Sequence, residues 1–380
     1  MVGNDKERPL AVFHHPGPVA PNGRTGSQVR PWQLLQAFRE EGYDVVPVVG
    51  HGAERRQQIE AVYHALSSGR RISFVYSESR SIPTLLTEPH RLPRFPLMDF
   101  RFLRAMREAR VPVGLFYRDI FWRFQMYRTM LSWPGRAMAI PLYWYDWWWY
   151  QRAVDHLFLP SQGMAAHLPT PWPAERLSAL PPGIRFLDIA GSTESPRRAE
   201  ALQLLYVGGV RPPSYDLTPL LATVRGLTGI RLTLCCRPEE WETVRPRYAP
   251  LINDRVDVVH CAGEELRELY AKADLFALLR EPHEYLDFAV PVKLFESLGH
   301  GLPIITLAGT EAARIVGQYG LGWVLADTAS VRPLVEQLQC NPALLDEKRA
   351  AVLRAQEQHS WRARAREIAN TLARYDRRIA

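Results

Sequence analysis

The chain has 380 residues, of which 47% are hydrophobic and 23% charged, a composition that is typical of globular proteins and excludes disordered and low-complexity classes. Its net charge of +7 favours anionic partners such as phosphate groups, nucleic acid or an acidic membrane surface. The sequence contains no zinc finger, basic zipper or ribonucleoprotein-type motif, so we do not expect nucleic acid to be a partner.

Short apolar runs alternate with amphipathic stretches through the first half of the chain. Each run is a predicted strand, and the stretches between runs are predicted helices. The predicted strands are 10–13, 45–49, 72–76, 113–117 and 155–159. The predicted helices are 27–41, 54–66, 100–109 and a strongly aromatic helix before the last strand, and a Gly/Pro-rich loop occupies 14–26. This order predicts a parallel sheet with helical crossovers.

The same pattern restarts after a segment at 177–198 that has the Pro, Gly, Ser and charge content of a linker. The second set of predicted strands is 204–207, 231–235, 256–260, 275–279, 303–307 and 322–325. The helices predicted with them are 219–227, 264–272, 292–299, 310–319 and a helical tail at 342–380. The sequence therefore predicts an α/β protein with two doubly wound parallel sheets and an interdomain cleft at the carboxyl ends of their strands.

The cysteine content and the apolar runs indicate the compartment. Four cysteines are too few for a disulfide framework and lack zinc-site spacing: Cys235, Cys236, Cys261 and Cys340. The N-terminus has no apolar stretch of signal-peptide length, and no run is long enough to span a membrane. We therefore expect a reducing, cytoplasmic compartment.

The most informative segment is PVKLFESLGHGLPII, residues 291–305. Pro291 suits the first turn of a helix, whose free N–H groups form an anion site. Lys293 in this turn is unfavourable for the helix dipole, and a bound diphosphate would explain its presence. Glu296, one turn further on, could accept hydrogen bonds from both hydroxyls of a ribose. The alternative is an amphipathic helix with one exposed lysine and one exposed glutamate, and the segment alone does not separate the two interpretations.

Several segments, taken in order, resemble the GT-B glycosyltransferases, especially their large retaining family (glycosyl transferases group 1, family 4 type). They are AVFHHPGPVAPNGRTGSQVR, GLFYRDIFW, DHLFLPSQGM, ALPPGIRF, LYVGGVRPP, ELYAKADLFAL, PVKLFESLGHGLPII and GLGWVL. The resemblance covers nearly the whole chain. It implies the GT-B architecture: a Rossmann-like acceptor-binding domain at 1–183, a Rossmann-like nucleotide-sugar donor-binding domain at 184–355, and a C-terminal helix at 356–380 that packs back toward the first domain.

In the second domain, the resemblance implies a donor site. Glu296 matches the glutamate that holds the nucleotide ribose. Lys293 and the amide of Leu294 match the phosphate-facing side of the same helix. Gly209 belongs to a matching glycine turn, and Arg211 stands where a basic residue neutralises the donor diphosphate.

Two positions depart from the family pattern. The family often has a Lys-Gly pair a few residues after the basic residue, and this lysine is absent from 212–216, so that Lys293 or another arginine would have to replace it. Phe288 stands where the family often has a second glutamate. Asp287 and Glu284 are nearby and could contact hydroxyls of the donor sugar.

In the first domain, Arg118 and Asp119 match the family's His-Asp or Arg-Asp position near the reacting sugar, where Asp119 could position or deprotonate an acceptor hydroxyl. The alternative for Asp119 is a buried carboxylate that caps a turn. Gly23 and Gly26 match the glycine loop that approaches the donor phosphates. Arg30, one turn into the following helix, is expected to be solvated rather than bound to phosphate.

These matches imply a hexosyltransferase that moves a sugar from a nucleoside diphosphate donor to a hydroxyl of a glycan, lipid-linked or small-molecule acceptor, as in polysaccharide biosynthesis. Fixed cations and helix amides can stabilise the charge that develops on the leaving diphosphate. Since the sequence has no Asp-x-Asp motif and no His/Cys cluster, we expect no metal and no other cofactor. The resemblance favours retention of configuration, whereas inversion would need a base such as Asp119. The alternatives are a nucleotide-sugar epimerase on the same fold and a non-catalytic sugar-nucleotide-binding protein.

Residues Phe116–Tyr150 form a second unusual segment, because they hold six of the eleven tryptophans and several arginines. Trp and Tyr favour membrane interfaces, and arginines favour anionic headgroups. The segment could therefore reach a lipid-linked acceptor at the inner face of the cell membrane, as a peripheral contact. It could equally be a core or interdomain helix, or a platform on which sugar rings stack.

Overall fold

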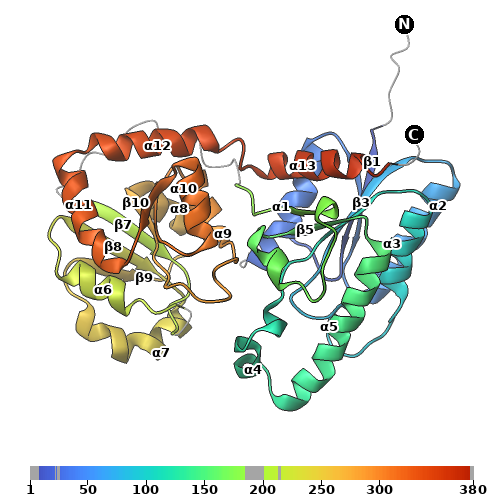
Figure 1. Ribbon diagram of the computed structural model, residues 1–380, viewed down its shortest axis with the longest axis horizontal. Coiled ribbons are helices and arrows are strands. Elements are labelled where there is room, and N and C mark those ends of the chain that lie inside the picture. Colours follow the sequence, from blue (N-terminus) through green and yellow to red (C-terminus); the bar gives the residue numbers. More distant parts are fainter. Residues whose placement is uncertain (1–7, 22, 24–25, 185–200, 213–214, 377–380) are drawn as a thin grey trace, which may run out of the picture. The chain divides into compact units, whose positions relative to one another are not determined.

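The computed structural model describes residues 8–21, 23, 26–184, 201–212 and 215–376 (Figure 1). The chain divides into two compact units. The first unit comprises Met1–Gly183 together with Trp361–Ala380, and the second comprises Ile184–Ser360. Each unit contains a six-stranded sheet in which all pairs are parallel. The α/β class with two doubly wound sheets, predicted from the alternating pattern, is confirmed.

The sheet of the first unit has the strand order β2-β1-β3-β4-β5-β6. Its strands are β1 (Leu10–His15), β2 (Asp44–Val49), β3 (Ile72–Glu78), β4 (Val113–Phe116), β5 (His156–Leu159) and β6 (Leu177–Ala179). Its helices are α1 (Gly26–Glu40), α2 (Gly52–Ser67), α3 (Met98–Glu108), α4 (Met126–Met130), α5 (Trp133–Ala153) and α13 (Trp361–Ala373). The prediction of a linker at 177–198 is wrong at its start, because the three residues of β6 pair with β5. Three residues are too few to show an apolar pattern in the sequence. Residues 185–198 of that linker lie outside the described residues.

The sheet of the second unit has the strand order β12-β11-β10-β7-β8-β9. Its strands are β7 (Leu202–Val207), β8 (Ile230–Cys235), β9 (Val256–Val259), β10 (Leu275–Leu278), β11 (Ile304–Leu307) and β12 (Gly322–Leu325). Its helices are α6 (Thr218–Arg225), α7 (Pro238–Tyr248), α8 (Glu264–Lys272), α9 (Val292–Gly299), α10 (Glu311–Tyr319), α11 (Val331–Cys340) and α12 (Ala343–Ala355). Leu204 and Tyr206 pack in one core cluster, and Leu205 and Val207 in another. Because alternate strand residues point to opposite faces, both faces of this sheet are covered.

The predicted helical tail is two helices, α12 and α13, which belong to different units. Helix α13 lies alongside α1 (Figure 1) and buries Trp361, Ile368 and Leu372 in the core of the first unit. A Cβ atom at Gly114 of β4 would lie 2.9 Å from a methyl group of Leu372, so glycine lets the helix approach the sheet closely.

Helix α5 has two faces of different character. Tyr143, Trp147 and Tyr150 are buried, and the Trp147 indole N–H donates to the hydroxyl of Thr170 at 2.8 Å. Trp144 and Trp148, one helical turn apart, are 43% and 47% exposed. The core interpretation therefore holds for one face only, and the other carries exposed tryptophans. Among the described residues, we find no helix with the length and apolarity that a bilayer crossing requires.

Asp146 is a buried carboxylate on the inner face of α5. Its Oδ2 accepts a hydrogen bond from the Thr84 backbone N–H at 2.7 Å, while its Oδ1 is buried without a partner. Burial, which outweighs the hydrogen bond from Thr84, raises the pKa of Asp146 from its usual 3.8 to about 7. The folded state therefore holds this proton over a pH range in which the unfolded chain has already released it.

We expect Asp146→Asn to remove a specific pH dependence of stability. As the pH rises from about 4 to about 7, the wild-type protein should lose up to about 4 kcal/mol of unfolding free energy relative to the variant. The loss is complete above pH 7, where both states are ionised. Urea denaturation of both proteins at pH 5 and pH 8 measures this difference, and parallel behaviour of the two proteins would contradict the assignment.

Candidate active site

Two side chains from the start of α9 form an ion pair in the second unit. The Lys293 ammonium donates to Glu296 Oε2, and the Tyr270 hydroxyl of α8 donates to the same oxygen at 3.4 Å. The side chains of Lys293 and Glu296 are 29% and 33% exposed, so both charges remain open to a ligand. The helix has the predicted bounds, and its two candidate residues act as one unit rather than as separate surface charges.

Tyr270 fixes the position of the Glu296 carboxylate. Its ring is buried and stacks on the His300 ring, with centroids 4.3 Å apart and planes within 5°. Burial, reinforced by the negative charge of Glu296, raises the pKa of Tyr270, so the hydroxyl stays protonated and remains a donor.

Lys293 is close to the carboxyl end of the neighbouring strands. Burial raises the pKa of the Cys235 thiol at the end of β8, and the positive charge of Lys293 acts on the same thiol in the opposite direction. Since β10, β7 and β8 are adjacent and parallel, their carboxyl ends share one edge of the sheet. The ion pair of α9 therefore lies at the edge where doubly wound sheets bind ligands.

The glycine turn after β7 lies at the same edge. Its Gly209 carbonyl accepts a hydrogen bond from the Tyr206 hydroxyl at 2.5 Å, and a Cβ atom at Gly209 would lie 3.1 Å from the Tyr215 ring. Arg211 is exposed and makes a single long contact, at 3.4 Å, with the Glu239 carbonyl. Within the described part of the chain, no contact joins Arg211 to Lys293 or Glu296.

Arg280 is a cation at this edge that the sequence analysis missed. It follows β10, and its guanidinium lies over the Tyr215 ring, 4.6 Å from the centroid. Its Nε is buried without a hydrogen-bond partner. Together with Tyr206, Tyr215 and His283, Arg280 lines a cavity of about 160 Å³. The sequence offers two indications of this role. Arg280 directly follows a predicted apolar strand, and the lysine that the family often has after the glycine turn is absent from 212–216.

Phe288 and Asp287, in the loop before α9, have different surroundings. Phe288 is buried and packs edge-to-face against the Tyr285 ring, with centroids 5.2 Å apart, so it serves the core. Asp287 is exposed, and its backbone N–H donates to the His283 carbonyl at 3.0 Å. No contact among the described residues brings the Asp287 carboxylate to Glu296.

In the first unit, Glu78 is fully buried between two arginines. Its Oε2 accepts from Arg118 Nη2 at 2.8 Å, and its Oε1 accepts from Arg30 Nε at 3.1 Å and from the Tyr76 hydroxyl at 3.0 Å. The prediction that Arg30 is solvated is wrong, because this residue is 3% exposed and its guanidinium lies 3.5 Å from the centroid of the Phe116 ring. Its partner stands 48 positions away, so no local pattern reveals it.

Asp119 is engaged in local contacts at the end of β4. Its Oδ1 accepts from the Phe121 backbone N–H at 3.0 Å, and its Oδ2 accepts from the Ser81 hydroxyl at 3.4 Å. The contact with Phe121 is the turn-capping arrangement given as the alternative for this residue. Gly26 is the first residue of α1, and a Cβ atom at Gly23 would lie 2.7 Å from the Gln28 side chain, so the loop needs glycine for its own close approach.

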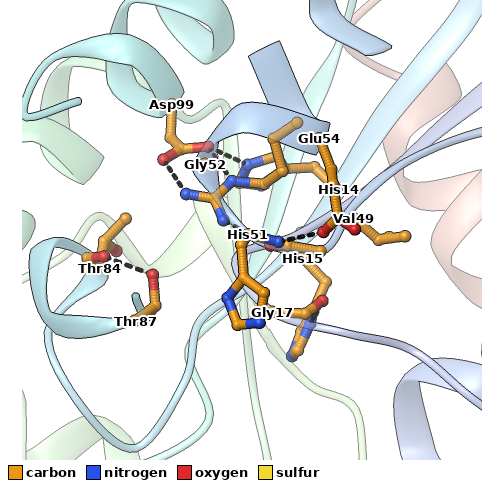
Figure 2. Close-up of polar contacts among 12 residues, drawn as sticks. His14, His15, Gly17, Val49, His51, Gly52, Glu54, Thr84, Thr87 and Asp99 are labelled. Atoms are coloured by element: carbon orange, nitrogen blue, oxygen red, sulfur yellow. Dashed lines mark hydrogen bonds and ion pairs between the residues drawn. The ribbon is translucent and has the colours of Figure 1, made fainter. Parts of the chain in front are cut away.

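The first unit contains a second buried network of side chains (Figure 2). The His14 ring bonds the Ser77 hydroxyl at 2.8 Å and Asp99 Oδ1 at 2.9 Å, and Asp99 also accepts from Arg55 Nε and Nη2 at 2.8 and 2.9 Å. Burial disfavours the charge on Asp99, but His14 and Arg55 outweigh it and hold its pKa well below the usual range. All four side chains are buried, which indicates that this network stabilises the fold.

Comparisons with known proteins agree with the geometry of both units. Residues 217–370 match the family model described as Glycosyl transferase-like. The comparison with curated protein sequences finds no match. A solved glycosyltransferase from Rickettsia africae is 9% identical with a TM-score of 0.66, over 97% of this chain and 99% of that one.

Two further solved structures are similar along their whole length. HepE from Anabaena, in complex with UDP, is 13% identical with a TM-score of 0.61, over 96% of this chain and 100% of that one. WaaG, a glycosyltransferase involved in lipopolysaccharide biosynthesis, is 15% identical with a TM-score of 0.55, over 96% of this chain and 99% of that one. The chain therefore has the GT-B fold over nearly its whole length, and the family match covers the segment that contains α9.

Proposed function

We propose that this protein is a glycosyltransferase, which takes its sugar from a nucleoside diphosphate sugar bound at the carboxyl edge of the second sheet. The observation that carries the proposal is the Lys293–Glu296 pair, held by Tyr270 at the start of α9. The carboxylate can accept the two hydroxyls of a ribose, and the helix start with its lysine attracts the diphosphate. HepE, a similar structure, is solved with UDP and with UDP-glucose, which supports the same class of ligand here.

The leaving diphosphate is proposed to be stabilised by side-chain cations. Lys293, Arg211 and Arg280 all follow strands whose carboxyl ends share one edge, and Arg280 still has an unused buried donor. Such fixed charges stabilise the negative charge that develops as the anomeric C–O bond breaks. We therefore propose that the transfer needs no metal ion. Full activity in the presence of EDTA is the expected result, and activity that returns only on addition of Mg²⁺ would contradict it.

A thermal-shift screen against UDP, GDP, dTDP and ADP tests the donor site directly. A ligand that binds only the folded protein stabilises it by about 2.7 kcal/mol at one hundred times its dissociation constant. We expect one nucleoside diphosphate to raise the melting temperature by a few degrees and inorganic phosphate at the same concentration to raise it much less. If none of the four nucleotides shifts the transition, the donor site is wrong.

The transfer is proposed to retain the anomeric configuration and to place the sugar on a hydroxyl of a glycan, lipid-linked or small-molecule acceptor, as in polysaccharide biosynthesis. Both carboxylate oxygens of Asp119 already accept hydrogen bonds from the protein, which favours a structural role over that of a general base. The leaving phosphate is then the group that takes the acceptor proton. The anomeric proton coupling in the NMR spectrum of the product settles the stereochemistry, and an inverted product would contradict this step.

The exposed face of α5 is proposed to bind an anionic membrane surface at the inner face of the cell membrane. Trp133 is 72% exposed, and Trp144 and Trp148 follow it on the same face of the helix. The Arg152 guanidinium lies 3.7 Å from the centroid of the Trp148 ring. Indole rings beside guanidinium groups suit the headgroup region of an anionic bilayer.

Replacing Trp133, Trp144 and Trp148 together by alanine should reduce binding to vesicles that contain anionic lipid by at least about tenfold, because their apolar area drives insertion. Co-sedimentation with phosphatidylcholine–phosphatidylglycerol vesicles measures the bound fraction. The matched control replaces Val324 and Leu353, which are 41% and 53% exposed in the second unit, and should bind as the wild type does. If the tryptophan variant binds these vesicles as well as the wild type does, the exposed face of α5 does not bind the membrane.

A further inference from the structure

Arg80, two residues beyond β3, rests on the turn that follows β1. A Cβ atom at Gly17 would lie 2.9 Å from Arg80 Nη1 and 3.3 Å from its Cζ, so glycine lets the guanidinium lie flat against the backbone. The turn is well fixed, because the Gly17 N–H donates to the His15 carbonyl at 2.8 Å and the Gly17 carbonyl accepts from the Gly50 N–H and from His15 Nδ1, both at 2.9 Å. Figure 2 shows His15 and Gly17 in this turn. Arg80 is thus positioned at the carboxyl edge of the first sheet.

No carboxylate of a residue that the structure describes neutralises Arg80. It is half-buried and makes no hydrogen bond or ion pair with any residue that the structure describes. The charged groups that act on it are Arg91, Arg118 and Arg55, and their repulsion, after burial, lowers the pKa of Arg80. Burial, with the charges of Arg118 and Arg80, also lowers the pKa of the neighbouring His15 to about 3, so that ring is neutral.

The surrounding arginines differ in whether their charge is balanced. Arg118 is paired with Glu78 at 2.8 Å, and Arg55 is paired with Asp99 through two hydrogen bonds. Arg91, like Arg80, has no ion pair within the described part of the chain, and it is exposed. A half-buried guanidinium without a partner costs free energy that an anionic ligand would recover.

We propose that Arg80 binds an oxyanion of the acceptor, either a phosphate or a carboxylate. The inference rests on the proposed function, in which the donor is held by residues of the second unit and the acceptor is the remaining substrate. The planar fork of a guanidinium matches phosphate and carboxylate oxygens equally well. The acceptor is then a hydroxyl compound that also carries a phosphate or a carboxylate group.

Calorimetric titration of the full chain with inorganic phosphate and with acetate tests the proposal. The titration is made with the second unit saturated by the nucleoside diphosphate that the donor screen identifies, or without nucleotide if none binds. We expect at least one anion to bind the wild type, and Arg80→Gln to weaken that binding by at least about tenfold. Tighter binding of phosphate would indicate a phosphate group on the acceptor, and tighter binding of acetate would indicate a carboxylate.

Two further variants separate position from charge. Gly17→Ala keeps the net charge but places a methyl group 2.9 Å from the Arg80 guanidinium, so it should displace the side chain and weaken anion binding similarly. Arg56→Gln removes an exposed charge of α2 that pairs with Glu60, and it should leave anion binding unchanged. Circular dichroism melting establishes that each variant is folded.

Equal anion binding by the wild type, Arg80→Gln and Gly17→Ala would overturn the proposal. A loss of nucleotide affinity in Arg80→Gln as large as that in Glu296→Ala would assign Arg80 to the donor and overturn it as well. If Glu296→Ala binds nucleotide normally while Arg80→Gln still loses the anion, the donor site fails and the anion site stands.

Discussion

Glu296→Ala is expected to weaken binding of the nucleoside diphosphate by about a hundredfold, or about 2.7 kcal/mol. The change removes the carboxylate that is proposed to accept both ribose hydroxyls, and each hydrogen bond to a charged group contributes strongly to binding. It also leaves Lys293 and the Tyr270 hydroxyl without their common partner. Isothermal titration calorimetry with the nucleotide from the donor screen measures the effect.

A matched control for this substitution lies in the preceding helix. Glu268 of α8 forms an exposed pair with Lys272, at 3.7 Å, and Glu268→Ala should leave nucleotide affinity unchanged. Glu296→Gln keeps the shape and one acceptor oxygen, so an intermediate loss is expected. Binding by Glu296→Ala within threefold of the wild type would show that this carboxylate does not hold the ribose.

Glu78→Ala should lower the free energy of unfolding by about 3–5 kcal/mol, because it leaves the buried Arg30 guanidinium and the mostly buried Arg118 guanidinium without their counter-charge. Glu78 has no exposed surface and bonds Arg30, Arg118 and Tyr76 at once. The Arg30 guanidinium cannot turn to water, since the residue is buried and its guanidinium lies against the Phe116 ring. Urea denaturation at pH 7 measures the difference.

The control for the Glu78 substitution is an exposed glutamate–arginine ion pair. Glu108 pairs with Arg104 at 2.7 Å on the surface of α3, and Glu108→Ala should cost less than about 1 kcal/mol. Glu78→Gln, which keeps volume and hydrogen-bonding atoms but removes the charge, should fall between the two. A loss below about 1 kcal/mol in Glu78→Ala would mean that the buried arginines find other partners.

The parts of the fold that the sequence predicts well are those with a local cause. Continuous apolar runs mark buried parallel strands, and the proline before Val292 marks the start of α9, whose predicted and observed bounds coincide. The short strand β6 and the proline-containing helix α7 escaped prediction, because three residues show no pattern and proline weakens a helical one.

The electrostatics of the site could not be predicted in the same way. Whether a charged side chain is buried depends on a partner elsewhere in the chain, as for Arg30 and Glu78, and no spacing within α1 indicates this. Arg80 and Arg280 stand out only once their surroundings are known, the first by the glycine beneath it and the second by a buried donor with no acceptor. The roles assigned to Lys293, Glu296, Arg211 and Asp119 stay predictions until the variants are measured.

The return of α13 to the first unit has a consequence for synthesis on the ribosome. Trp361, Ile368 and Leu372 of α13 complete a hydrophobic core whose members outside this helix all lie before Gly183, so that core stays open while residues 184–360 are being made. At ~5–20 residues per second, this delay is about 10–35 s. The later-made unit can thus finish folding first, and the nascent N-terminal half must be kept from aggregating until its last helix emerges.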